Sequence, residues 1–85
     1  METGSVVYSK AGHDINQVYL VIGVTEKGYL ELADGKLRSL TNPKIKNAKH
    51  VRYTGIKLTE AKEKYEQGKL MDSDLVWYLK PYQIK

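Results

Sequence analysis

The chain has 85 residues and a formal net charge of +4, enough for one domain with a modest core but too few for a deep catalytic cleft between layers. It contains no cysteine, which excludes disulfides and cysteine-ligated zinc and gives no sign of an oxidising compartment. The longest apolar stretch, residues 18–24, is far too short to span a bilayer and the N-terminus lacks the layout of a signal peptide, so we expect a cytoplasmic protein with no membrane partner.

A strand is expected over residues 18–24, where apolar side chains recur at every second position. One face of this strand should lie in the core, and the other should be half-buried by a barrel or covered by the C-terminal segment. The residues of the core face are Val18, Leu20, Ile22 and Val24. A short loop at residues 26–28 separates this strand from the next, in which Leu30 and Leu32 should point inward.

A hairpin is expected at Asp34-Gly35, because both central residues of a type I′ turn need positive φ. The strand after this turn would carry Leu37 inward, with Lys36 and Arg38 outward. Thr41-Asn42-Pro43 would end it, since proline lacks the donor that a sheet interior requires. After a short basic connection, residues 49–53 would form a last strand, with Val51 inward and His50 and Arg52 outward.

Two short helices are expected after Gly55, where the pattern changes. Thr59 could cap the first helix, and Gly68 could end it in the left-handed conformation. Asp72 or Ser73 could cap the second helix, which Pro81 would stop. Its apolar stripe is Met71, Leu75, Leu79 and Tyr82. Trp77 and Tyr78 are expected to dock against the preceding domain.

Three segments, in this order, carry a family resemblance. They are Val7-Tyr8-Ser9-Lys10-Ala11-Gly12-His13-Asp14, Ala33-Asp34-Gly35-Lys36-Leu37-Arg38 and Asn47-Ala48-Lys49-His50-Val51. Over about the first 53 residues the chain resembles a KOW domain, the small β-barrel of several ribosomal proteins and of short stand-alone bacterial RNA-binding proteins. The expected fold is therefore mainly β: a five-stranded SH3-like barrel over residues 1–54, followed by a helical C-terminal extension over residues 55–85.

The resemblance implies that the first inter-strand loop, Ser9 to Gln17, touches RNA. Asn16 stands where the family usually has glycine, and we expect it to keep a left-handed backbone, which asparagine tolerates better than most residues. Asp14 should stabilise the turn by accepting backbone donors. A tight turn without a ligand is the alternative interpretation of this loop.

Residues 35–59 hold seven Lys and Arg residues and no acid. Uncompensated charge of one sign attracts a polyanion, although a solvated face that keeps the protein soluble would have the same composition. Together with the resemblance, this segment predicts that the protein binds the phosphates of structured RNA, with ribosomal RNA as the leading candidate. The candidate RNA-binding residues are Ser9, Lys10, Gly12, His13, Asn16, Gln17, Lys36, Arg38, Lys44, Lys46, Lys49 and Arg52.

Aromatic residues give a second route to RNA. The chain has seven tyrosines and one tryptophan but no phenylalanine, and exposed aromatic faces can stack unpaired bases. Most of these rings are expected in or near the core, with Tyr8, Tyr29 and Tyr53 on the surface. Ribosomal proteins are a further expected partner.

We expect neither catalysis nor a cofactor. No nucleophile–base arrangement or phosphate-binding glycine loop is present, and the histidines His13 and His50 lie on different elements without metal-ligand spacing. The main alternative function is a protein-interaction adaptor, because an SH3-like barrel does not define a function. A DNA-reading helix-turn-helix is disfavoured, since residues 73–79 carry an acid and no base.

Overall fold

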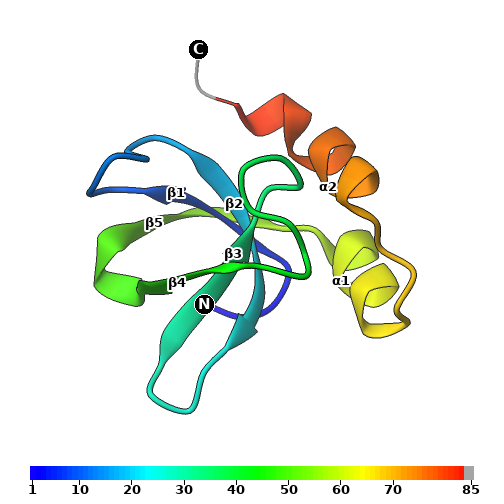
Figure 1. The fold of residues 1–85 in the computed structure, drawn as a ribbon, viewed down its shortest axis with the longest axis horizontal. Helices are drawn as coiled ribbons and strands as arrows, with labels where there is room; N and C mark the ends of the chain where they lie inside the picture. The colour runs from blue at the N-terminus through cyan, green and yellow to red at the C-terminus, as the bar shows by residue number, and fades with distance from the viewer. Residues whose placement is uncertain (84–85) are drawn as a thin grey trace.

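The computed structural model describes residues 1–83 and is mainly β, with five antiparallel strands in one sheet followed by two short helices (Figure 1). The strands lie side by side in the order β4-β3-β2-β1-β5, which confirms the expected fold class. Within residues 1–83 no ladder pairs β4 with β5, and closure into a barrel stays a prediction. The elements are β1 Ser5–Ser9, β2 Val18–Val24, β3 Tyr29–Ala33, β4 Lys44–Asn47, the 3₁₀ turn η1 Ala48–His50, β5 Val51–Lys57, α1 Thr59–Glu66, α2 Asp72–Leu79 and the 3₁₀ turn η2 Lys80–Tyr82. None of these helices is long and apolar enough to cross a membrane.

The central strand β2 is buried on both faces. One face packs on the helices, which cover one side of the sheet (Figure 1). This cluster contains Val6, Val18, Leu20, Ile22, Ala33, Ala61, Leu70, Leu75 and Leu79. The other face joins a second cluster, made of Val7, Tyr19, Val21, Leu30, Leu32 and Val51. The alternation predicted for β2 is therefore confirmed for Val18, Leu20 and Ile22, but Val24 at the strand end is exposed rather than in the core.

The expected hairpin at Asp34-Gly35 is wrong. Residues 34–43 form a loop, and Leu37 is 75% exposed instead of pointing inward. The cause is the buried carboxylate of Asp34, whose Oδ1 accepts the backbone N–H groups of Lys36 at 3.0 Å and Arg38 at 2.9 Å. These bonds to a side chain replace ladder bonds and end the strand. Gly35 does take positive φ, but inside this loop.

The loop of residues 34–43 covers the start of α2. The backbone N–H of Leu40 donates to Oδ1 of Asp72 over 2.8 Å. Gly35 lies so close that a Cβ there would collide with the carbonyl oxygen of Asp72. The first turn of α2 is therefore not free to enter a DNA groove, as a recognition helix would have to be.

The last strand lies further along the chain than expected. Lys49 and His50 belong to η1, and β5 runs from Val51, which is buried as expected, through Gly55 to Lys57. The sheet thus extends past residue 54, and the helices after it share a hydrophobic cluster with the sheet. The basic connection expected before this strand is itself a strand, β4.

The helices begin and end close to the expected residues. Thr59 is the first residue of α1, with Leu58 at the cap position, and Gly68 has positive φ just past its end. Leu75 and Leu79 are buried, but Trp77 is 70% exposed. The expectation that Trp77 docks against the sheet is wrong, because two residues along a helix rotate a side chain about 200° away from the face that Leu75 and Leu79 define.

Candidate nucleic-acid interface

The loop between β1 and β2, residues 10–17, is organised around the carboxylate of Asp14. Its Oδ1 lies 2.9 Å from both Ser9 Oγ and Lys46 Nζ. Its Oδ2 accepts the Tyr19 hydroxyl at 2.7 Å and lies 2.9 Å from Lys44 Nζ. Asp14 therefore ties the loop to β1, β2 and β4. The Asp14 carboxylate is bound by side-chain groups. The sequence had instead predicted that it would accept backbone N–H groups.

The surroundings of Asp14 keep it ionised. Burial on its own would raise the pKa of this carboxyl. Hydrogen bonds from Lys46, Tyr19, Lys44 and Ser9 outweigh burial and hold the pKa well below its ordinary value. Burial and the bond to Asp14 also raise the pKa of Tyr19, so its hydroxyl keeps the proton that it donates.

Lys46 is part of this internal network. Its Nζ lies 2.7 Å from Ser9 Oγ, 2.8 Å from the Ala11 carbonyl oxygen and 2.9 Å from Asp14 Oδ1. An ammonium has three donors, and all three are engaged within the protein. The side chain of Lys46 is only 10% exposed, against 27% for Lys44. The expectation that Lys46 offers a free surface charge is therefore wrong, and Ser9 is likewise buried in the network.

The outer side of the loop faces solvent. Lys10, Gly12, His13 and Asn16 are exposed. Asn16 has a φ of 71°, which confirms the left-handed backbone expected at this position. Its N–H donates to the Ser9 carbonyl oxygen over 2.9 Å, so the left-handed turn also closes the loop. Inner residues thus hold the shape while outer residues are free for a ligand.

A pocket of about 240 Å³ lies beside this loop. It is lined by Tyr8, Ser9, Lys10, Ile15, Asn16 and Arg52. The guanidinium of Arg52 lies 5.5 Å from the ring centroid of Tyr8, within the range of a cation–π contact. Lys10 and Arg52 give the pocket two cations, and within residues 1–83 no acid lines it. Ile15 was not among the residues expected at this site, although an apolar residue inside a polar loop is itself a signal.

The remaining candidate residues flank the loop on two sides. On one side, the Lys10 N–H donates to the His50 carbonyl oxygen over 2.7 Å, which places η1 and its exposed Lys49 beside the loop. On the other side, Gln17 Nε2 donates to Asp34 Oδ2 over 2.7 Å. That bond attaches the loop of residues 34–43, which carries Lys36 and Arg38. Gln17 is therefore a connector between two loops.

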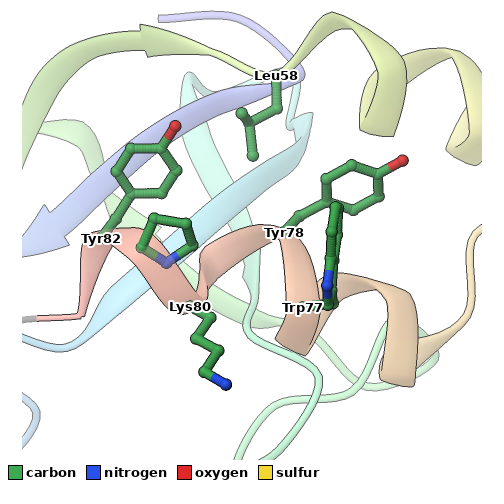
Figure 2. Close-up of a pocket in the computed structure, with 6 residues that line it drawn as sticks. Leu58, Trp77, Tyr78, Lys80 and Tyr82 are labelled. Carbon is green, nitrogen blue, oxygen red and sulfur yellow. The ribbon is translucent and has the colours of Figure 1, made fainter.

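A second pocket, of about 380 Å³, lies at the C-terminal helix (Figure 2). Sequence reasoning did not identify it, although an aromatic pair followed by Pro81-Tyr82 was a usable signal. Its lining is mostly aromatic and aliphatic: Leu58, Trp77, Tyr78, Lys80, Pro81 and Tyr82. Tyr8 connects the two pockets, because its hydroxyl donates to the Tyr82 carbonyl oxygen over 2.8 Å.

Comparison with known proteins gives no further guide to the site. No family model matches the chain, and no curated protein matches it significantly.

Proposed function

We propose that the protein is an RNA-binding domain of the translation apparatus. It binds the phosphates of structured RNA, and ribosomal RNA is the leading candidate. The observation that supports this proposal is the pocket beside the first loop, in which Lys10 and Arg52 meet with no acid among the lining residues. Phosphate contacts position a nucleic acid without reading its sequence. Little base selectivity is therefore expected from these cations.

The order of the loop supports the same proposal. A loop held by Asp14, Lys46 and Tyr19 does not have to be ordered when a ligand arrives, which lowers the cost of binding. The cations divide between two roles. Lys46 builds the loop, whereas Lys10, Arg52, Lys36 and Lys49 form no ion pair within residues 1–83. Ribosomal proteins as neighbours and a cytoplasmic location belong to the same proposal.

Salt dependence tests the phosphate contacts. Anisotropy of a labelled RNA hairpin should show affinity falling with salt, with a log–log slope of about −0.7 to −0.9 for each phosphate neutralised. The double reversal Lys10→Glu/Arg52→Glu should weaken binding to all RNAs alike and flatten the slope by about 1.4 to 1.8. Because both side chains are exposed, the melting temperature should change little.

A matched control uses exposed lysines away from the loop. Lys27 lies in the turn between β2 and β3, and Lys69 lies between the helices. Lys27→Glu/Lys69→Glu makes the same change in net charge and should leave most of the affinity and the slope intact. Equal losses of RNA affinity in the two double variants would show that net charge alone causes the effect, and would contradict a local site.

Recognition of a polypeptide is the second candidate function. The observation that favours it is the exposed Trp77 beside a mostly apolar pocket, since exposed aromatic side chains are frequent anchors of protein interfaces. Binding to RNA that ignores both salt and the reversal at Lys10 and Arg52 would favour this adaptor function.

A further inference from the structure

Trp77 is held in place but largely open to solvent. The indole makes an edge-to-face contact with the ring of Tyr78, with centroids 5.3 Å apart and planes at 76°. Such a contact covers at most one face of the indole, and the side chain is 70% exposed. Lys64 Nζ lies over the ring of Tyr78, 5.6 Å from its centroid. Trp77 therefore still has an open aromatic face to offer a ligand.

The pocket next to Trp77 has aromatic and ring-shaped walls. Figure 2 shows Trp77 and Tyr78 on one side, Tyr82 on the other, and Leu58 between them; Pro81 also lines the pocket. Walls of this kind suit a flat ligand with apolar faces, and unpaired nucleobases stack on such side chains. An apolar peptide side chain would also fit these walls, so shape does not choose between the two ligands.

Charge favours the nucleic acid. Among the described residues, the lining of this pocket contains Lys80 and no acid. The neighbouring pocket adds Lys10 and Arg52, again without an acid. An anionic ligand complements this rim better than a neutral peptide does.

One hydrogen bond links the linings of the two pockets. Tyr82 lines the pocket at Trp77 and Tyr8 lines the pocket at Arg52, and the Tyr8 hydroxyl donates to the Tyr82 carbonyl oxygen over 2.8 Å. We therefore propose that the pocket at Trp77 stacks one unpaired nucleobase of an RNA whose phosphates lie on the Lys10 and Arg52 side. This inference rests on the RNA-binding function proposed above and adds a preference for RNA with an unpaired nucleotide.

The test uses three labelled RNA hairpins: one fully paired, one with a single bulged uridine, and one with the bulged position abasic. Trp77 is the only tryptophan of the chain, so quenching of its emission reports stacking at this site alone. The bulged hairpin should bind more tightly than the other two and should quench Trp77. The paired and abasic hairpins should bind without quenching.

Substitutions at Trp77 identify the group responsible. Trp77→Ala should remove the preference for the bulged hairpin, a loss of roughly 5- to 150-fold in its affinity, and leave the paired hairpin unaffected. Trp77→Phe should keep part of the preference, because a ring remains. Tyr29→Ala removes an exposed aromatic ring from β3 and should keep the whole preference. Circular dichroism should show all three variants folded, since both side chains are exposed.

Three other outcomes would overturn the stacking site. Equal, salt-dependent binding of the three hairpins without quenching would remove it and leave the proposed RNA-binding function standing. Failure of every hairpin to bind would remove both proposals. An apolar peptide that shifts the emission of Trp77 while no RNA does so would assign the pocket to a polypeptide instead.

Discussion

The ammonium nitrogen of Lys46 lies 2.9 Å from Oδ1 of Asp14, so β4 at one edge of the sheet is tied to the loop after β1. The two groups are mostly buried and share Ser9 as a third partner. A buried pair of this kind acts as a structural unit, because removing one member leaves the other charged and poorly solvated. The consequences for stability can be measured by unfolding in urea.

Lys46→Ala should lower the free energy of unfolding by about 2 to 4 kcal/mol, since it removes the more buried of the two ammonium groups that balance the charge of Asp14. Lys44 binds the same carboxylate at 2.9 Å but is more exposed. Lys44→Ala should therefore cost less than about 1 kcal/mol. Similar losses in the two variants would show that Lys46 is no more important to the loop than Lys44.

Acid should weaken the protein partly through Asp14. The folded-state pKa of this carboxyl lies below its unfolded value of about 3.9. Its contribution to stability is therefore present above about pH 4 and is lost as the pH falls toward the folded-state pKa. Asp14→Asn should be less stable at pH 7 and should lose stability less steeply below pH 4. Urea midpoints measured from pH 7 to pH 2 check this slope.

Glu2 offers a control for the acid effect. Its pKa is also lowered, chiefly by a hydrogen bond to Lys57, but the side chain is 70% exposed. Solvent screens such a pair, so the urea midpoints of Glu2→Gln should match those of the unsubstituted protein closely across the same pH range. A slope that Asp14→Asn leaves unchanged would mean that other acids govern the acid transition.

Two glycines with nearly equal φ separate backbone strain from crowding. Gly28 has a φ of 82° and open space around it, whereas Gly35 has a φ of 84° and lies against Asp72 and Val76. Gly28→Ala should cost about 1 kcal/mol, from the left-handed backbone alone. Gly35→Ala should cost clearly more, because the added methyl also displaces α2 from the loop. Thermal unfolding of both variants measures the difference.

The helices should unfold together with the sheet. Leu75 is fully buried in the cluster that joins α2 to β1 and β2. Leu75→Ala should therefore destabilise the whole protein by about 2 to 5 kcal/mol. Trp77→Ala, two positions along but exposed, should cost much less. Far-ultraviolet dichroism and Trp77 fluorescence should report one shared transition. Two separate transitions would instead favour independent units at residues 1–54 and 55–85.

Local features of the chain were readable from the sequence by itself. The alternation of residues 18–24 identified β2 because side chains alternate between the faces of any strand. The left-handed backbone at Asn16 was expected because the resemblance places a glycine at this position, and asparagine tolerates positive φ. The helix ends at Thr59 and Gly68 were within one or two residues of the observed bounds, since capping depends on the residues at the ends.

Tertiary contacts decided the rest. Asp34-Gly35 has the composition of a hairpin turn, but the Asp34 carboxylate is buried and binds Gln17, far away in the chain. From the sequence, Lys46 was expected to be a surface charge, but the fold places Asp14 and Ser9 beside it. Each outcome turns on residues distant in the chain, so composition and periodicity of one segment could not supply it.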